Sequence, residues 1–503
     1  MKTLNKLLVL LIAASVALSA TACGKKGTEE IGNSDYTGEK TEIELWLWEA
    51  GYGKEYIKNI AKAFVEEYPM YTIKIEATAD SEFLSNKLPL NAELNSADLM
   101  MSVSLGRNMM EYCEPINDVL DYVNPGETKS IKEKIGTAIT DSLVYGDGKY
   151  YNVPYVSGYT GLTYNEDILK DYYIPNTTDE LIALVNELVS DHKVPFIHFT
   201  GGGYWDAMFN MWQGQYLGVD VIHDIYENPT LDKVTSDDNG VLEALKVLEE
   251  CLNSPKKYVN GSNAFNFTDA QTLYLEGESV MMVNGSWMEY EMSGNYEPGT
   301  KNFKMMKTPV ISSIINKCPS IEDDDELSSL VKAIDAGKTT LVGTGYEVTQ
   351  DDYNRVAEAR KIMYNHCIGH AACVPKYSDN IKGAKDFLKF YFSDRALKIF
   401  ADTTKTKSIA DFDGNVTIDT STWSTWQKTQ LKIDSECVPF SETGNNQHVL
   451  YSIGGMSLTA DVAYISKLST NSASDRMTAQ EIWNDIKVYH NNTWNRYHAN
   501  AGL

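Results

Sequence analysis

Three short segments combine residue types that could bind a metal ion or a phosphate group. NHCIGHAAC, over residues 365–373, holds two histidines and two cysteines, but zinc sites usually separate two close ligand pairs by roughly a dozen residues. DFDGN, from Asp411, starts like a calcium loop but lacks the third acidic position and the closing glutamate. Gly201 to Gly203 is followed by no Lys-Ser or Lys-Thr pair. We therefore expect no metal and no cofactor, and instead a loop entering a strand, a β-turn and a flexible turn.

Motifs of hydrolytic enzymes are missing as well. The sequence contains no G-x-S-x-G elbow and no H-E-x-x-H helix, and none of its cysteines lies in a nucleophile motif. A glycoside hydrolase needs only two suitably placed carboxylates, and the chain has 70 acidic residues. A lipid-anchored glycoside hydrolase therefore stays open as an alternative, although we expect a protein that is not an enzyme.

The body of the chain begins with a strand, a helix and a second strand. In residues 41–48 Ile43, Leu45 and Leu47 alternate with other side chains, as in a strand. Residues 54–68 show helical spacing before Pro69, and residues 71–77 form the next strand. This βαβ pattern predicts a parallel pair of strands in an α/β fold. Ligands bind beyond the carboxyl ends of such strands, so Trp48, Glu49 and Tyr52 are candidate ligand contacts.

The N-terminal residues are typical of an export signal. Lys2 and Lys6 precede an apolar run of about a dozen residues, too short to cross a bilayer, and small residues lead to Cys23. This arrangement resembles the lipobox of bacterial lipoproteins, in which the cysteine is lipidated. We expect removal of residues 1–22, an acyl lipid on Cys23, and a flexible polar tether over residues 23–40.

Length and charge limit the possible partners. The 503 residues exceed what one hydrophobic core normally serves, which predicts two lobes. The formal net charge of −26 argues against nucleic acid and against attachment to anionic lipid through basic residues. Membrane attachment then depends on the lipid, on the extracytoplasmic face of the cell membrane.

The segment from Asp147 to Leu181 resembles extracellular solute-binding protein family 1, the group that includes maltose-binding proteins. Gly148 and Lys149 lead to a Val-Pro strand, Tyr164 and Asn165 follow, and a helix start of the Pro-x-Thr-x-x-Glu-Leu type begins at Pro175. Thr177 and Glu180 also form a capping box ahead of an apolar stripe. Two further blocks are similar to the family, one around Gly277 to Val310 and one from Cys373 to Thr404, where Lys382 to Phe400 reads as one long helix.

The resemblance implies a two-lobed periplasmic-binding-protein-like fold of type II. Each lobe is expected to be a mostly parallel sheet flanked by helices, and a hinge joins the lobes. Phe303 to Val310 resembles a second crossing between them. The expected lobe 1 is residues 41–153 plus 309–395, and lobe 2 is 154–308 plus 396–503. Residues 310–363 are longer than the family pattern and could form an inserted subdomain. Thr478 and Glu481 should cap the C-terminal helix.

The same resemblance implies the receptor of an ABC importer, a monomer that binds a solute between its lobes, closes, and delivers it to a membrane permease. The family often stacks sugars on aromatic rings, and the chain has 9 Trp, 31 Tyr and 14 Phe. An oligosaccharide is therefore the expected ligand, with a peptide, polyol or organophosphate as the alternative. The ligand-binding candidates are Trp48, Glu49, Tyr52, Tyr155, Tyr204, Trp205, Trp287 and Tyr451.

Overall fold

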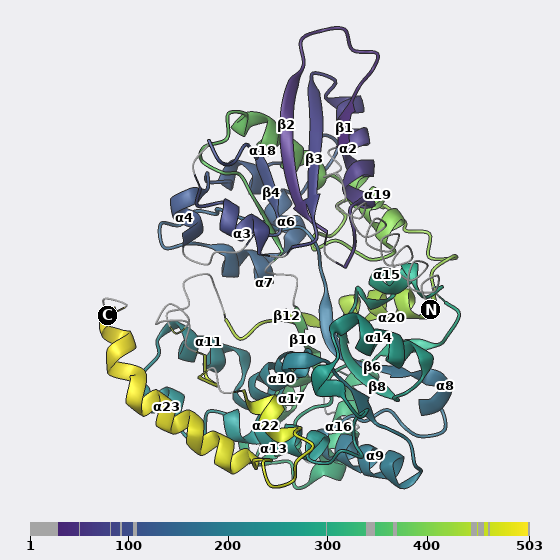
Figure 1. Ribbon diagram of the computed structural model, residues 1–503, viewed down its shortest axis with the longest axis vertical. Helices are drawn as coiled ribbons and strands as arrows, with labels where there is room; N and C mark the ends of the chain where they lie inside the picture. The colour runs from purple at the N-terminus through teal and green to yellow at the C-terminus, as the bar shows by residue number, and fades with distance from the viewer. Residues whose placement is uncertain are drawn as a thin grey trace, which may run out of the picture.

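Two α/β lobes, one above the other in Figure 1, make up the computed structural model. It describes residues 29–49, 51–80, 82–90, 93–103, 108–297, 299–338, 348–365, 370–443, 450, 457–460 and 463–500. The predicted signal segment, Cys23 and Tyr451 lie outside these residues.

Lobe 1, the upper lobe of Figure 1, is built on a sheet with the order β1-β3-β2-β4-β11-β5. Strand β2 pairs in parallel with both β3 and β4, which confirms the predicted βαβ unit. Ile43, Leu45 and Leu47 enter the main core of the lobe, whereas Trp46 lies in a smaller core on the opposite face, so the sheet is buried on both sides. The strands are β1 (Glu29–Gly32), β2 (Thr41–Trp48), β3 (Tyr71–Thr78), β4 (Leu99–Met101), β5 (Val153–Pro154) and β11 (Ala371–Cys373).

The helices of lobe 1 follow the predicted apolar stripes with one interruption. α2 buries the expected stripe and ends just before Pro69. The long helix predicted over residues 382–400 is instead two helices, because the Ser393 hydroxyl accepts a hydrogen bond from the Ala396 amide (3.2 Å) and caps a new helix. The helices are α2 (Glu55–Glu67), α3 (Phe83–Lys87), α4 (Met109–Tyr112), α5 (Asn117–Leu120), α6 (Ile131–Ile135), α7 (Thr137–Thr140), α18 (Ile381–Tyr391) and α19 (Asp394–Thr404).

Lobe 2, the lower lobe, has a second sheet with the order β12-β10-β6-β8-β7, and β9 pairs with β6. β10 and β12 are parallel, as are β7 and β8, whereas β6 runs antiparallel to β8, β9 and β10. The strands are β6 (Tyr159–Asn165), β7 (Phe196–Ile197), β8 (Met281–Gly285), β9 (Phe303–Met305), β10 (Ile362–Asn365) and β12 (Val438–Phe440).

Both sheets are therefore mixed, and the prediction of mostly parallel sheets is wrong. In lobe 1, β4 runs antiparallel to β11, and β11 runs antiparallel to β5. The reason is the crossing of the chain between lobes: β5 and β10 each end where the chain leaves a lobe, whereas β6 and β11 each begin where it enters the other. An entering strand beside a leaving strand must run in the opposite direction.

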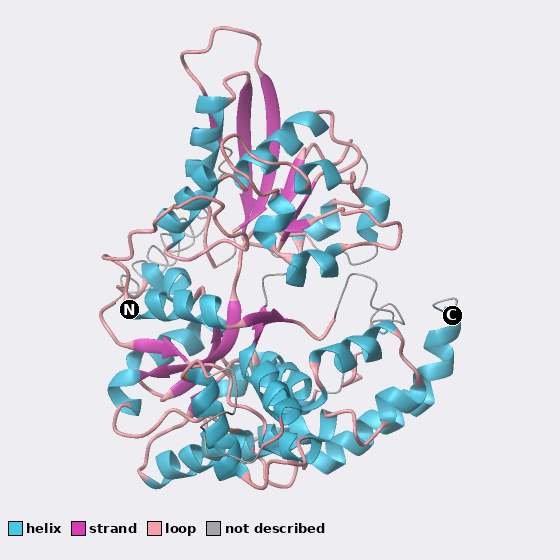
Figure 2. Ribbon diagram, turned by 180° about the vertical axis from the view of Figure 1, so that it is seen from behind, coloured by secondary structure: helices cyan, strands magenta, loops and turns pink. Residues whose placement is uncertain are grey.

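Helices surround the lobe 2 sheet and extend to the C-terminus (Figure 2). At the start of α9 Thr177 accepts from the Glu180 amide (3.2 Å), but the Glu180 carboxylate turns to the Asn176 amide (2.6 Å), so only half of the predicted capping box forms. The box of Thr478 and Glu481 is complete. The helices are α8 (Glu166–Leu169), α9 (Thr178–Ser190), α10 (Trp205–Leu217), α11 (Val219–Glu227), α12 (Leu231–Thr235), α13 (Val241–Leu252), α14 (Phe267–Glu276), α15 (Met288–Glu291), α16 (Asp324–Asp335), α17 (Gln350–Lys361), α20 (Thr425–Glu436), α22 (Tyr464–Leu468) and α23 (Ala479–Asn500), with short 3-10 turns between some of them.

The lobe boundaries differ from the prediction in three places. Phe303 to Val310 does not cross between the lobes, since β9 pairs with β6 and the Val310 amide bonds to the Asn176 carbonyl (2.8 Å). Buried side chains from Ile311 to Met363 consequently pack in the lobe 2 core rather than in lobe 1. α19 stays in lobe 1, where Phe400 packs on Tyr56 of α2 (5.0 Å between ring centres). At the N-terminus the predicted tether includes strand β1, which pairs with β3.

Candidate functional site

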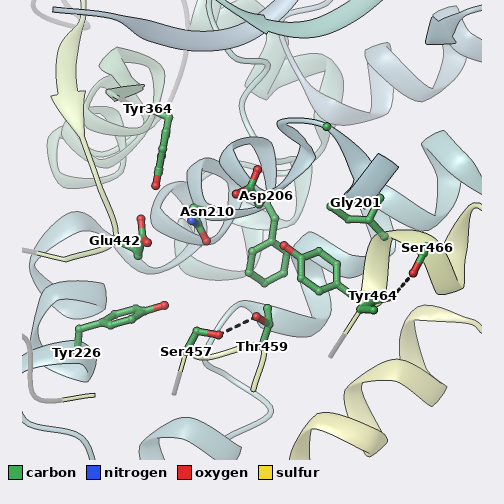
Figure 3. A pocket seen from close by; sticks show the side chains of 14 residues that line it. Gly201, Asp206, Asn210, Tyr226, Tyr364, Glu442, Ser457, Thr459, Tyr464 and Ser466 are labelled. Carbon is green, nitrogen blue, oxygen red and sulfur yellow. Dashed lines mark hydrogen bonds between the residues drawn. The ribbon is translucent and has the colours of Figure 1, made fainter. Parts of the chain in front are cut away.

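A pocket of about 560 Å³ lies in lobe 2, beside the end of β10, where the chain leaves for lobe 1. Figure 3 shows that its walls come from segments far apart in the sequence. The lining residues are Gly201, Gly203, Asp206, Phe209, Asn210, Tyr226, Tyr364, Glu442, Ser457, Thr459, Ala463, Tyr464, Ile465 and Ser466.

Helix α10 supplies one wall because its faces differ in character. Trp205, Met208 and Trp212 are fully buried in the lobe core. Asp206 and Asn210 are one helical turn apart, so both side chains lie on the face that lines the pocket. The core therefore fixes the helix, and the helix holds a carboxylate and an amide in the pocket.

The glycine turn before α10 lets a second helix approach. Gly201, Gly202 and Gly203 all have positive φ angles, of 81°, 91° and 63°. A Cβ atom on Gly202 would lie 2.5 Å from Ile465 Cγ2 on α22. The turn that the sequence predicted at Gly201 to Gly203 thus allows α22 to pack close enough to form the opposite wall.

Two carboxylates and two phenols share one electrostatic environment in this pocket. Neighbouring protein groups raise the pKa of Asp206 by desolvation, against a backbone hydrogen bond from the Ala207 amide, although Asp206 is exposed to solvent through the pocket. Burial first, and then the charges of Glu442 and Asp206, raise the pKa of Tyr364 well above 10.0. Burial and the same two carboxylates raise the pKa of Tyr464 in the same direction. Both phenols therefore remain protonated and able to donate hydrogen bonds at neutral pH.

Aromatic rings complete the walls. Phe209 and Tyr464 lie 5.1 Å apart between ring centres, tilted by 43°. Tyr364 packs edge-on against Phe440 (6.4 Å) at the end of β12. In Figure 3 the side chains of Tyr226, Tyr364 and Glu442 point toward a common space. Phe209, Tyr226 and Tyr464 are buried and support the pocket from behind, whereas the ring of Tyr364 is half-buried. The pocket surface is thus rich in hydrogen-bond donors and acceptors, which suits a polyhydroxylated solute.

Two of the sequence-predicted contacts are buried in the lobe cores. Trp205 is fully buried, edge-on against Phe196 (5.0 Å between ring centres) in lobe 2. Tyr155 is 1% exposed in lobe 1, where its hydroxyl bonds to that of Ser102. Neither side chain lines the pocket.

Tyr52, Tyr204 and Trp287 meet at a contact between the two lobes. The Tyr52 hydroxyl lies 3.1 Å from the Ser157 carbonyl and 3.0 Å from the Ser286 hydroxyl of lobe 2. Trp287 packs edge-on against Tyr204 (5.8 Å) and belongs to the lobe 1 core although it directly follows β8 of lobe 2. These three residues, predicted as ligand contacts, thus lie at the joint between the lobes, and none of them lines the lobe 2 pocket.

Trp48 and Glu49 lie at the carboxyl end of β2, at the side of lobe 1 that faces lobe 2 (Figure 1). Both are half-buried. Trp48 stacks on His370 (4.9 Å between ring centres) and donates to the Ala79 carbonyl (3.3 Å), and Glu49 pairs with Lys54. Trp48 and Glu49 thus lie at the strand end where the sequence pattern predicted them, but neither side chain lines the pocket in lobe 2.

Sequence reasoning did not identify the residues that line the pocket. Asp206 and Asn210 carry a readable signal, since they form a polar pair at i and i+4 in the mostly apolar first half of the helix. Tyr364 and Glu442 carry no local signal, because the parallel pairing of β10 with β12 brings them together from distant positions. That pairing became visible only in the folded chain.

Neither a metal site nor a membrane-spanning helix is found among the described residues. Within them, no group of three or more His, Cys, Asp or Glu side chains is arranged to hold a metal ion. Cys373 is buried and His370 stacks on Trp48, while His366 and Cys367 lie outside the described part of the chain. A search of the same residues also finds no helix with the length and apolar character needed to span a membrane.

A family model and three known sequences that match this chain all describe binding proteins. The family model for bacterial extracellular solute-binding proteins matches residues 50–398. A galactooligosaccharide-binding protein of Bacillus subtilis is 21% identical, with 66% of this chain and 72% of that protein covered. A multiple sugar-binding protein of Streptococcus mutans is 23% identical, over 61% of this chain and 71% of that protein. An uncharacterized ABC transporter extracellular-binding protein of Pyrococcus horikoshii is 27% identical, and the match spans 56% of this chain and 64% of that protein.

Solved structures share the fold. A bacterial solute receptor described as having an exclusive preference for β-D-galactopyranose gives a TM-score of 0.59 at 16% identity, with 90% of this chain and 98% of that one covered. The apo form of RafE from Streptococcus pneumoniae gives a TM-score of 0.57 at 14% identity, with 91% and 99% covered. The two-lobed α/β fold expected from the sequence is thereby confirmed. This chain belongs to the family of bacterial extracellular solute-binding proteins.

Proposed function

We propose that this solute-binding protein is a carbohydrate receptor and that the lobe 2 pocket holds the sugar. The observation that carries the proposal is the set of groups in that pocket: the Asp206 and Glu442 carboxylates, the Asn210 amide and the tyrosines of α11, β10 and α22. Carboxylates and amides accept hydrogen bonds from sugar hydroxyls, and phenols donate them. Phe209 and Tyr464 are buried behind the pocket surface, so the half-buried ring of Tyr364 is the proposed aromatic contact of the sugar.

The names of the relatives support the same ligand class. Two of the related sequences are named for binding galactooligosaccharides or multiple sugars. Among the solved structures with this fold, one is described as a complex with raffinose. A pocket of about 560 Å³ lies within the usual range for small-molecule sites and has room for more than one hydroxyl-bearing ring.

Closure of the two lobes is the proposed signal. The chain passes between the lobes at residues 154–159, between β10 and β11, and between α19 and α20, and these connections are the proposed hinge. Trp48 is the last residue of β2, whose carboxyl end faces lobe 2 in Figure 1, and it is the proposed contact of lobe 1 with the sugar. A ligand that touches both lobes stabilises the closed form by its differential affinity for that state.

Delivery to a permease and attachment to the membrane complete the proposal. An acyl lipid on Cys23 would keep the receptor close to its permease and raise the effective concentration of the loaded form. Acyl labelling of the wild-type chain and of Cys23→Ser tests the anchor. Equal labelling of both proteins would contradict it.

Thermal unfolding of residues 24–503 against a panel of mono- and oligosaccharides, polyols and peptides tests the receptor function. A ligand at about 100 times its Kd stabilises the protein by about 2.7 kcal/mol, which raises Tm by several degrees. We expect a shift with a sugar that chromatography recovers intact. A shift only with peptides or polyols would contradict the carbohydrate assignment, and recovery of cleaved sugar would make the protein a hydrolase.

A further inference from the structure

The indole ring of Trp287 lies between two glycines that belong to different lobes. A Cβ atom on Gly51, in the turn after β2 of lobe 1, would lie 2.6 Å from Trp287 Cδ1. A Cβ atom on Gly285, the last residue of β8 of lobe 2, would lie 2.2 Å from Trp287 Cζ2. Neither glycine has a positive φ angle, so each position needs glycine for space rather than for its backbone conformation.

The backbone of Trp287 belongs to lobe 2, whereas its side chain belongs to the core of lobe 1. The residue follows β8 by two positions, yet its side chain is 7% exposed and packs in the main hydrophobic cluster of lobe 1. Withdrawing an indole ring from a core exposes a large apolar area to water. A rotation of one lobe against the other therefore costs least when this ring stays in place.

The ring also lies beside the first connection between the lobes, at residues 154–159. The amide of Ser286, which precedes Trp287, donates to the Tyr159 carbonyl (2.8 Å). From the lobe 1 side, the Tyr52 hydroxyl donates to the Ser157 carbonyl (3.1 Å). The displacement between two rotating bodies is smallest next to their hinge, which is where a contact between them can persist through the motion.

We propose that Trp287 is the pivot of lobe closure, so that the lobes rotate about its indole ring and the close approach of Gly51 to that ring sets the angle between them. The inference rests on the proposed closure around a solute. It gives Trp287 a positioning role in place of the ligand contact that the sequence predicted. A side chain added at Gly51 would act as a wedge, because Gly285 holds the opposite edge of the ring.

The distance between two nitroxide labels, measured by pulsed electron resonance without any solute, tests the pivot. Lys382→Cys on α18 of lobe 1 and Lys332→Cys on α16 of lobe 2 supply exposed label sites, since these lysine side chains are 81% and 61% exposed. The cysteines of the described chain are buried, and Cys367→Ser removes the remaining one from residues 24–503. All variants are compared in this labelled background.

We expect Gly51→Ala to change the mean distance between the labels by about 2 Å or more, because a small displacement at a pivot is amplified at the far ends of the lobes. Gly294→Ala is the matched control. A Cβ atom at Gly294 meets no atom within 4 Å and its φ angle is not positive, so the same substitution should leave the distance unchanged.

Trp287→Phe supplies a second measurement. Its smaller ring keeps an aromatic side chain in the lobe 1 core but no longer fills the space between the glycines, so the distance distribution should broaden. A wild-type distance in folded Gly51→Ala, or an equal change in Gly294→Ala, would overturn the pivot. If Gly51→Ala does not fold, an unbroadened distribution in Trp287→Phe overturns it. Because no solute is present, these outcomes are separate from the thermal-shift test of the carbohydrate function.

Discussion

The two lobes are built from the same kinds of elements but place some of their charged side chains differently. Lobe 1 contains a buried ion cluster, in which Lys134 Nζ contacts Glu127 (2.6 Å), Asp394 (2.8 Å) and the Phe392 carbonyl (2.7 Å). Lobe 2 leaves its carboxylates Asp206 and Glu442 facing a pocket. Lys134 thus holds two carboxylates inside lobe 1, whereas Asp206 and Glu442 line a pocket in lobe 2. The proposed function therefore assigns solute recognition mainly to lobe 2, whereas the buried cluster contributes to the stability of lobe 1.

The largest expected effect concerns stability, in lobe 1. Lys134→Met leaves Glu127 and Asp394 without their shared cation, and breaking a buried pair of this kind costs about 3 to 5 kcal/mol. Urea unfolding should show this loss, while sugar affinity measured well below Tm should not change. Lys382→Met is the control, because the Lys382 side chain is 81% exposed and its pair with Asp386 contributes little. Loss of affinity in folded Lys134→Met would contradict the division between the lobes.

The next effect concerns recognition, in lobe 2. Asp206→Ala removes a charged hydrogen-bond acceptor, worth about 1.5 to 3 kcal/mol, so we expect affinity for a neutral sugar to fall about 10- to 150-fold. Calorimetry measures the change, and Asp220→Ala on the neighbouring helix should have no effect. Unfolding should change little, because Asp206 is not part of the lobe core. Equal affinities of Asp206→Ala and wild type would place the sugar elsewhere.

Acid should weaken lobe 2 before lobe 1. Burial lowers the pKa of His198 and of His490 below 6.5, only partly offset by their hydrogen bonds to Asn263 and Leu458. The unfolded chain therefore binds more protons, so stability is complete above about pH 6.5 and declines as pH falls, by at most about 1.4 kcal/mol per histidine and pH unit. His198→Gln and His490→Gln should flatten this decline between pH 7 and 5.5 in chemical unfolding.

Lobe 1 should respond to acid at lower pH. Burial alone would raise the pKa of Asp394, but hydrogen bonds from Lys134 and from the amides of Asp413 and Gly414 outweigh it and hold the pKa below 3.8. The stability that this carboxylate contributes is complete above about pH 3.8 and is lost only as pH falls further. If the histidine variants decline with pH as steeply as the wild type, the assignment of the earlier decline to lobe 2 is wrong.

The smallest expected effect is the contribution of lobe 1 to binding. Trp48→Ala removes one aromatic contact, worth about 0.5 to 1.5 kcal/mol, so affinity should fall only about 2- to 10-fold. Small-angle scattering on the same variant should show less compaction on addition of sugar. An effect larger than that of Asp206→Ala would reverse the roles of the two lobes.

The sequence predicted those parts of the fold that depend on local pattern. The alternation at Ile43, Leu45 and Leu47 gave β2, and the helical stripe before Pro69 gave α2, because each pattern is read within one element. The capping box of Thr478 and Glu481, at the start of the C-terminal helix, was predicted for the same reason. The break at Ser393 was not predicted, since its apolar stripe continues across the new helix start.

The pocket and the lobe boundaries depend on long-range pairing and were missed. Aromatic residues near strand ends were the natural candidates, yet Tyr155 and Trp205 pack inside the cores. Segment 303–310 was expected to cross because it resembles the family's second crossing, but the pairing of β9 with β6 keeps it in lobe 2. The sequence shows which side chains are apolar but not which distant strand lies beside them.

The most direct test of the account is a crystal structure of residues 24–503 with the neutral sugar that gives the largest thermal shift. We predict that the sugar lies in the lobe 2 pocket, with hydroxyls within hydrogen-bond distance of Asp206, Asn210 and Glu442 and with Trp48 of lobe 1 approaching from the other side. A sugar bound away from these three side chains would contradict the assignment of recognition to lobe 2.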